Sequence, residues 1–254
     1  MDVVMIGAGN VAHVLGRTLK KAGHTIVSIW NRDPAKAVLL AGELSAKAVE
    51  QPEELPDDAD IYILAVSDHA IAELLPMLSI SKGILIHNAG TVGIGILSQS
   101  AKQYGVLWPM KMLRSSMNEL GDCTMVIDGN DEATRRLLFE LAGQLVGRVT
   151  VADDLKRQKM HLIAAIGSNF TNHMYHLAAD YCKETGIDFS LFYPLIASTA
   201  LQIQTAYPGD VQAGPAFRGD KGTLERHREL LSDNEALLHL YDEITASIRK
   251  KFDR

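Results

Sequence analysis

Short apolar runs alternate with helical patterns along the first part of the chain. The runs that predict strands are 2–6, 24–30, 61–66, 83–87, 106–108, 124–128 and 148–151. The helices predicted between them cover 10–22, a segment from 34 onward, 68–78 and 132–145, with Asp33 and Asp68 as expected N-caps. Strands that alternate with helices, among them the fully apolar run at 61–66, predict a doubly wound α/β domain with a largely parallel sheet.

The pattern changes near residue 152. Helical periodicity then covers roughly 154–183, 188–206, 222–231 and 234–251, without a good strand candidate. Glycine and proline break it at Gly186, at 207–210 and at 214–215. We therefore predict an α/β domain at 1–152 and an all-α domain at 153–254.

The first strand leads directly into Gly7-Ala8-Gly9-Asn10-Val11-Ala12, at the start of a helical pattern. This is G-x-G-x-x-A, a variant of the dinucleotide-binding fingerprint, in the β-α-β context that the fingerprint requires. Gly7 permits the tight turn, and Gly9 lacks the Cβ that would keep a pyrophosphate from the backbone. The phosphates would then lie at a helix N-terminus, which favours anions. The alternative is a glycine turn that binds nothing.

The end of the second strand discriminates between the two nicotinamide cofactors. An NAD site usually has an acid there to hold the ribose 2′-hydroxyl, whereas this chain has Asn31-Arg32. A guanidinium suits a 2′-phosphate, and Asp33 before Pro34 fits a helix cap better than a ribose ligand. We therefore expect NADP rather than NAD, with Arg32 as an ordinary surface cation as the alternative.

Two further strand ends should lie in the same crevice, because ligands of doubly wound sheets bind outside the carboxyl ends of the strands. These ends carry Ser67 and the stretch His87-Asn88-Ala89-Gly90-Thr91, which could instead be a plain turn capped by Thr91. The expected cofactor contacts are Gly7, Gly9, Asn10, Val11, Asn31, Arg32, Val66, Ser67, Asn88 and Gly90.

A row of polar residues lies on the long helix predicted from 154. Ser168 and Asn172 fall within about 20° of His161 on a helical wheel, and Asn169 flanks them. Such groups among leucine, isoleucine and alanine need partners or a wet cleft. His161 is the first candidate proton donor, since histidine titrates near neutral pH, and Lys111 after a strand is the second. Ser168 and Asn169 would orient a substrate; the alternative is a polar helix seam or a dimer contact.

Another cluster, Gly214-Pro215-Ala216-Phe217-Arg218-Gly219-Asp220, predicts an unusual loop. Arg218 and Asp220 could form an ion pair in it. The sequence leaves open whether this loop is functional or a structural connection between helices.

Composition narrows the class of protein. The 254 residues are 47% apolar and 22% charged, with a net charge of −6, so no basic surface suggests nucleic acid. We expect no membrane span, no signal peptide and no metal, since the two cysteines, Cys123 and Cys182, lack metal-ligand spacing. Two cysteines without a disulfide pattern suggest the reducing cytoplasm.

The chain resembles proteins that combine a Rossmann-like domain with a C-terminal domain called DUF2520. The stretches that carry the resemblance are GAGNVA at 7–12, HNAG at 87–90, HLIAAIGSNFTNH at 161–173 and GPAFRGD at 214–220. Relatives of this family include pyrroline-5-carboxylate reductase, prephenate dehydrogenase and the coenzyme-F420-dependent NADP reductases. The resemblance implies an NADP-binding domain, a helical dimerisation domain and an oxidoreductase activity without an assigned substrate.

The same resemblance points to His161, Ser168, Asn169, Asn172, Arg218 and Asp220 as functional residues. Many relatives have His-Pro or Tyr-Pro followed by Leu-Gln where this chain has Trp108-Pro109-Met110-Lys111, so roles of that His or Gln do not carry over.

We predict an NADP-dependent oxidoreductase that transfers a hydride between NADP(H) and a small polar carbonyl or imine, as a homodimer. One alternative is an NADP-binding or sensing protein without turnover. Another is a flavin or deazaflavin as hydride partner, which the sequence leaves open.

Overall fold

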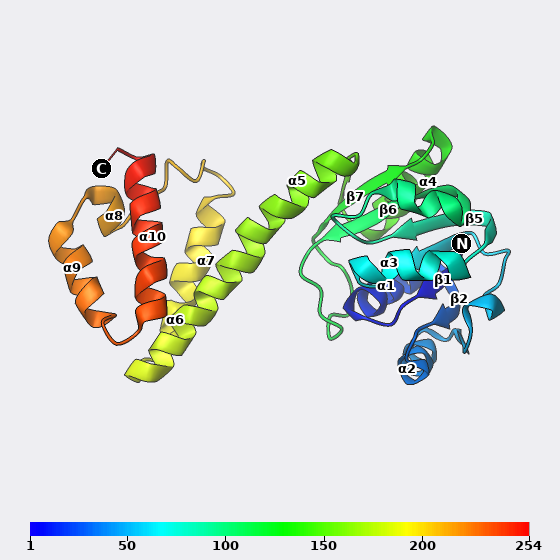
Figure 1. The fold of residues 1–254 in the computed structure, drawn as a ribbon, viewed down its shortest axis with the longest axis horizontal. Coiled ribbons are helices and arrows are strands. Elements are labelled where there is room, and N and C mark those ends of the chain that lie inside the picture. The colour runs from blue at the N-terminus through cyan, green and yellow to red at the C-terminus, as the bar shows by residue number, and fades with distance from the viewer. Residues whose placement is uncertain (254) are drawn as a thin grey trace. The chain divides into compact units, whose positions relative to one another are not determined.

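The computed structural model describes residues 1–253, which divide into two compact units, Met1–Asn169 and a second unit that begins at Phe170 (Figure 1). The change from α/β to all-helical structure falls after the strand Arg148–Val151, close to residue 152 as the pattern indicates. The first compact unit nevertheless extends past 152, because the helix α5, Asp154–Ala164, packs on the sheet.

The first unit contains one eight-stranded sheet, with the strand order β3-β2-β1-β4-β5-β6-β7-β8. The strands are β1 Asp2–Ile6, β2 Thr25–Trp30, β3 Lys47–Val49, β4 Ile61–Leu64, β5 Ile80–His87, β6 Ala101–Met110, β7 Thr124–Gly129 and β8 Arg148–Val151. Neighbours run parallel except β6 and β7, which are antiparallel. The predicted doubly wound α/β architecture is therefore confirmed.

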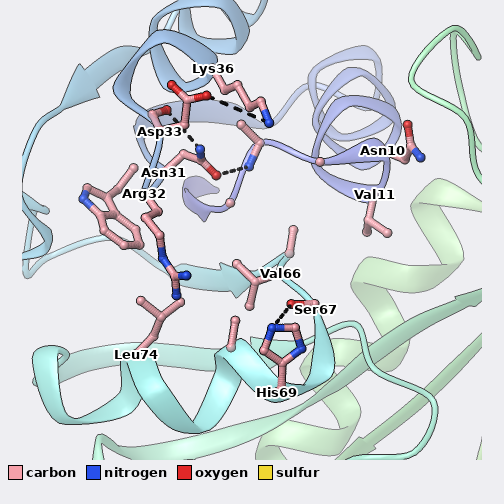
Figure 2. Close-up of a pocket in the computed structure, with 16 residues that line it drawn as sticks. Asn10, Val11, Asn31, Arg32, Asp33, Lys36, Val66, Ser67, His69 and Leu74 are labelled. Carbon is pink, nitrogen blue, oxygen red and sulfur yellow. Dashed lines mark hydrogen bonds and ion pairs between the residues drawn. The ribbon is translucent and has the colours of Figure 1, made fainter.

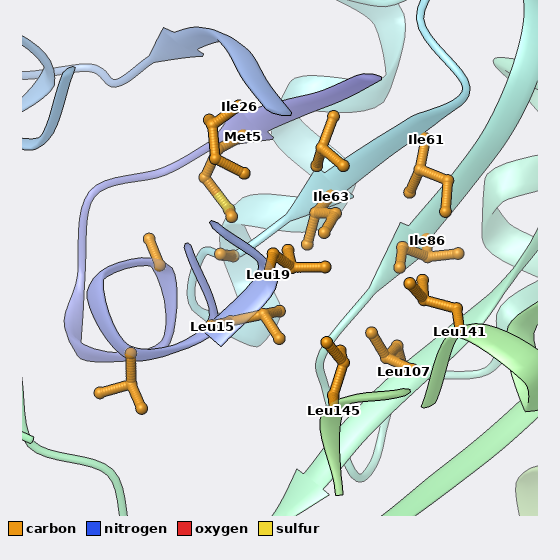
Figure 3. Close-up of a cluster of buried hydrophobic side chains, with 14 of the residues drawn as sticks. Met5, Leu15, Leu19, Ile26, Ile61, Ile63, Ile86, Leu107, Leu141 and Leu145 are labelled. Atoms are coloured by element: carbon orange, nitrogen blue, oxygen red, sulfur yellow. The ribbon is translucent and has the colours of Figure 1, made fainter. Parts of the chain in front are cut away.

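Helices cover both faces of the sheet, since successive side chains of a strand point to opposite faces. Val3 and Met5 of β1 pack with the helices α1, α2 and α4, in the cluster drawn in Figure 3. Val4 and Ile6 face the other side, where α3 covers the sheet. The bounds of these helices are α1 Asn10–Lys21, α2 Pro34–Leu44, α3 Asp68–Leu74 and α4 Glu132–Leu145.

Sequence patterns located most elements but not all of their lengths. The short edge strand β3 was not predicted, because three half-buried residues carry too little apolar signal. Strands β5 and β6 are longer than expected, since they begin before the apolar runs, where Ile80 pairs with Ala101 across a register irregularity. The prediction of Asp68 as an N-cap was wrong: Ser67 occupies that position, and the Asp68 carboxylate accepts a hydrogen bond from the Thr91 hydroxyl.

Within the described residues, all regular elements of the second unit are helical. Its elements are α6 Thr171–Thr185, a 3-10 turn Phe189–Phe192, α7 Tyr193–Gln202, α8 Pro215–Arg218, α9 Lys221–Leu230 and α10 Glu235–Lys251. The helix α6 ends at Gly186, which has a left-handed φ of 73° as predicted for a helix break. One turn of π-helix, Ala165–Phe170, separates α5 from α6, so the single helix expected over 154–183 is interrupted.

Among residues 1–253, none of the helices combines the length and the apolar character that a bilayer crossing requires.

Candidate active site

The turn between β1 and α1 contains two glycines with opposite requirements. Gly7 has a φ of +113°, and a Cβ there would lie 2.3 Å from the Ala65 carbonyl oxygen, so only glycine fits. At Gly9, by contrast, a Cβ would meet nothing within 4 Å. At Gly9 no side chain caps α1, and Asn10 and Val11 of its first turn line the cavity described below. A pyrophosphate fits this geometry, because it can approach the Gly9 backbone and accept hydrogen bonds from the first N–H groups of the helix.

A cavity of about 570 Å³ opens beside this turn, at the carboxyl ends of β1, β2 and β4 (Figure 2). Its walls include most of the residues predicted to contact the cofactor, namely Gly7, Gly9, Asn10, Val11, Asn31, Arg32, Val66 and Ser67. Lys36, His69 and Leu74 add to the lining. Asn88 and Gly90 do not belong to it.

Several polar side chains at this cavity are already engaged with the protein. The Asn31 amide accepts from the Ala8 N–H at 3.1 Å and donates to the Asp33 carbonyl at 3.0 Å, so it holds the glycine turn. Asp33 caps α2 as predicted, since its carboxylate accepts from the Ala35 N–H at 3.1 Å. The acid nearest to the expected ribose position therefore serves the helix.

Two cations stand at the rim of the cavity. The Arg32 Nη2 donates to Glu73 Oε2 on α3 at 2.8 Å, and the Lys36 Nζ lies 3.9 Å from Asp33 Oδ2. The Arg32 and Glu73 side chains are 72% and 57% exposed. Arg32 thus faces solvent and the cavity together, where a phosphate could reach it.

The end of β5 is buried rather than open. His87 is inaccessible to solvent, and its burial, together with the Arg157 guanidinium, lowers the pKa of its imidazole to about 4. The Asn88 Nδ2 donates to the Leu107 carbonyl, while its buried Oδ1 has no hydrogen-bond partner within residues 1–253. Gly90 lies against a helix: a Cβ there would be 2.3 Å from His161 Cδ2. The space beside Gly90 is therefore occupied by the His161 side chain.

A buried arginine fastens α5 to the segment after β5. Arg157 is fully buried, and its Nη2 donates to the Val92 carbonyl and, at 2.7 Å, to Asp154 Oδ1. The same carboxylate accepts from the Ile94 N–H at 3.1 Å. Sequence reasoning missed Arg157, because an arginine in a polar helical turn normally indicates an exposed position.

A second cavity, of about 220 Å³, lies one helical turn beyond this anchor and is called the Trp108 pocket here. It is lined from the end of β6 by Trp108, Met110, Lys111 and Met112, and from α5 and the π turn by His161, Ala164, Ala165, Ser168 and Asn169. The rings of Trp108 and His161 are 5.6 Å apart. All four residues predicted to act in catalysis, His161, Lys111, Ser168 and Asn169, thus line one pocket within the first unit.

The four residues differ in how free their polar groups are. The Lys111 Nζ donates to the Leu120 carbonyl at 2.7 Å and to the Asp122 carbonyl at 3.3 Å, so the ammonium holds the loop after β6. His161 is an exposed side chain against the pocket wall. These contacts favour His161 over Lys111 as a proton donor.

The π turn decides which amide joins the pocket. Its i→i+5 hydrogen bonding adds a residue to one turn, so Asn169 moves onto the face of His161. Of the stripe predicted on a regular helix, His161 and Ser168 line the Trp108 pocket, whereas Asn172 is not part of its lining.

The loop at 214–220 is structural in its contacts. Gly214 and Gly219 have φ values of +106° and +69°, and the Asp220 carboxylate caps α9 by accepting from the Thr223 N–H at 3.1 Å. Within the described chain, Arg218 and Asp220 do not form a direct ion pair, but hydrogen bonds from Thr223 and, to a smaller extent, the charge of Arg218 lower the pKa of the Asp220 carboxyl.

Two family models match the chain. One, described as NADP oxidoreductase coenzyme F420-dependent, matches residues 2–103, and one described as domain of unknown function (DUF2520) matches residues 123–248. No curated protein matches the chain.

Among solved structures, one matches this chain at 32% sequence identity, and several others share its fold at lower identity. A candidate NADP oxidoreductase from Bacteroides fragilis, BF3122, is 32% identical with a TM-score of 0.91, covering 100% of this chain and 98% of its own. A 1-pyrroline-5-carboxylate reductase from Streptococcus pyogenes is 14% identical, covers 98% of both chains and has a TM-score of 0.69. A reductive aminase from Aspergillus terreus, solved with NADPH and ethyl-5-oxohexanoate, is 17% identical, with 98% and 94% covered and a TM-score of 0.74. At these lower identities the similarity is one of fold.

The match to BF3122 along the whole chain agrees with the two family models and with the glycine turn beside an open cavity. The chain belongs to the family of NADP oxidoreductases in which an F420-dependent-type NADP oxidoreductase domain is followed by a DUF2520 domain.

Proposed function

We propose that the protein binds NADP(H) in the cavity beside Gly7–Val11, in preference to NAD(H). The open space at Gly9 and the uncapped start of α1 suit a pyrophosphate. Arg32 at the rim suits a 2′-phosphate, and Asp33 is engaged as a helix cap instead of holding a ribose hydroxyl. The NADPH of the Aspergillus terreus structure supports the same cofactor class.

The reaction that this site supports best is hydride transfer between NADP(H) and a small polar carbonyl or imine. NADPH, when bound, supplies the hydride. The observation that carries the proposal is the Trp108 pocket, in which an exposed histidine, Ser168 and Asn169 converge within the unit that also contains the glycine turn. Its volume of about 220 Å³ suits a small molecule.

The residues of the Trp108 pocket have separable roles. Ser168 and Asn169 orient the substrate through hydrogen bonds to its oxygen or nitrogen. His161 donates a proton to that atom as negative charge or amine basicity develops on it. Trp108 packs against the His161 ring and, with Met110, excludes water from the reacting group.

Calorimetry with NADP⁺ and NAD⁺ tests the cofactor. The protein should bind NADP⁺ more tightly, and Arg32→Ala should weaken NADP⁺ by about 1–3 kcal/mol, the range for a charged hydrogen bond, without a comparable loss for NAD⁺. Tighter NAD⁺ binding by the unmodified protein would contradict the proposal.

Catalysis is tested by NADPH oxidation against a panel of keto acids, imines and aldehydes. Once a substrate is found, His161→Gln should lower turnover by about a hundredfold or more while NADP(H) affinity changes little. His239→Gln, an exposed histidine on α10, is the matched control. Normal turnover of His161→Gln would transfer the role to Lys111, and tight NADP(H) binding without turnover of any substrate would indicate a sensing protein.

A further inference from the structure

An ion pair crosses one end of the cofactor cavity. Arg32 follows β2, Glu73 lies on α3, and their Nη2 and Oε2 atoms are 2.8 Å apart. Figure 2 shows the Arg32 side chain extending from the end of β2 across the cavity toward Leu74, the residue after Glu73. The guanidinium best placed for a cofactor phosphate therefore already binds a carboxylate of the protein.

The competition between these anions follows from their chemistry. A guanidinium binds carboxylates and phosphates through the same planar fork of N–H donors, so a donor engaged by one is lost to the other. The Glu73 carboxylate also repels a phosphate that approaches Arg32. NAD(H) has no 2′-phosphate and is not subject to either effect.

We propose that Glu73 is a specificity-determining residue, whose carboxylate competes with the 2′-phosphate of NADP(H) for Arg32 and so limits the preference for NADP(H) over NAD(H). The inference rests on the proposed function, because it requires the cofactor to bind in this cavity. Arg32 then makes the protein bind NADP(H) more tightly than NAD(H), and Glu73 limits how large that difference in affinity is.

The size of the effect is bounded by the exposure of the pair. Both side chains are more than half exposed, and exposed ion pairs are weak, so releasing Arg32 should tighten NADP⁺ binding by about two- to fivefold. Removing the repulsion adds to this gain, and salt screens both contributions, so the difference should shrink as ionic strength rises.

The test compares dissociation constants of NADP⁺ and NAD⁺ by calorimetry for the unmodified protein and Glu73→Gln. The glutamine keeps the shape of the side chain, and thermal melting checks that the fold is retained. Glu53→Gln is the matched control, since Glu53 is an exposed acid in the Pro52–Glu54 turn for which the described residues provide no ion pair. Glu73→Gln should tighten NADP⁺ by about two- to fivefold at low salt and leave NAD⁺ unchanged, while Glu53→Gln changes neither.

A double variant identifies the mechanism. In an Arg32→Ala background, Glu73→Gln should lose most of its effect, because the competed donor is gone. If Glu73→Gln leaves NADP⁺ affinity unchanged or weakens it, Glu73 is not a competitor. The cofactor assignment still stands in that case, provided that the unmodified protein prefers NADP⁺ and Arg32→Ala loses that preference. If the unmodified protein binds neither cofactor or prefers NAD⁺, both the inference and the proposed function fail.

Discussion

The two compact units of this chain differ in how completely they bury their apolar side chains. In the first, the side chains of Val3–Ile6 in β1 and of all of β4 are inaccessible, and helices cover both faces of the sheet. In the second, α7 has no buried residue, and Leu191, Tyr193 and Leu195 are 70%, 60% and 63% exposed. An apolar helix that stays exposed in one copy usually marks an interaction surface. The sheet of the first unit thus has a complete core, whereas the exposed apolar side chains of the second unit indicate a partner, for which we propose a second copy of this chain.

The largest expected effect is on molecular mass. We expect a homodimer at micromolar concentration, held by the exposed apolar face of the second unit, and Leu195→Asp should convert it to a monomer of 27.8 kDa. Light scattering measures the mass. Leu39→Asp is the control, because Leu39 on α2 of the first unit is exposed to a similar degree, 72%, and should leave the mass unchanged. A monomeric unmodified protein would contradict the proposed dimer.

The next prediction concerns the buried Arg157, which holds α5 against the segment after β5. Arg157→Ala leaves the Asp154 carboxylate and the Val92 carbonyl without their buried donor, and it should cost about 3 kcal/mol in free energy of unfolding, at the low end for a broken buried pair because the Asp154 side chain is 42% exposed. Urea unfolding followed by tryptophan fluorescence reports on the first unit alone, because both tryptophans, Trp30 and Trp108, lie in it. Arg157→Met keeps most of the volume but loses the same donors, so it should cost nearly as much; a much smaller loss would show that packing rather than the ion pair anchors α5.

Acidification should lower the free energy of unfolding of the first unit by about 3 kcal/mol, through the buried His87. The pKa of His87 falls from 6.5 in the unfolded chain to about 4 in the fold, so only the unfolded state gains a proton between these values. Stability is therefore retained above pH 6.5 and is lost as pH falls through 6.5 toward 4. Three charges act on this imidazole: Arg157 lowers the pKa of His87, whereas Asp154 and Asp68 raise it.

Urea unfolding of the unmodified protein and of His87→Leu is measured between pH 7 and pH 4. The contribution of His87 is the difference between the two proteins in the slope of the free energy of unfolding against pH. Equal slopes would mean that His87 does not stay neutral in the fold.

The smallest effect separates ligand binding from folding within the first unit. Gly9→Val should weaken NADP(H) binding by about a hundredfold or more, through the space it occupies, with an unchanged melting temperature, because its φ of −89° suits valine. Gly7→Val should instead lower the melting temperature, since its Cβ collides with the Ala65 carbonyl. Normal cofactor affinity in Gly9→Val would reduce the glycine motif to a turn.

Local signals in the sequence were sufficient for much of this molecule. Apolar runs and helix caps predicted the doubly wound fold, with α4 at Glu132–Leu145 and β8 at Arg148–Val151 found to the residue. The glycine turn, the Asp33 cap and the residues at three strand ends could be located because each depends on neighbours in sequence or on the general rule that parallel strands end at one edge.

Tertiary structure alone decided the features that depend on distant partners. The burial of Arg157 could not be read from its sequence neighbours, since one of its two partners, the Val92 carbonyl, lies in the distant segment after β5. The π turn changes the phase of the helix and brings Asn169 rather than Asn172 to His161, because a helical wheel assumes regular hydrogen bonding throughout. Likewise, Arg32 could be recognised as a cation after β2, but its pairing with Glu73 arises only when α3 packs beside β2 across the cavity. Periodicity determines which faces are buried, whereas the packing of whole elements determines which polar groups meet.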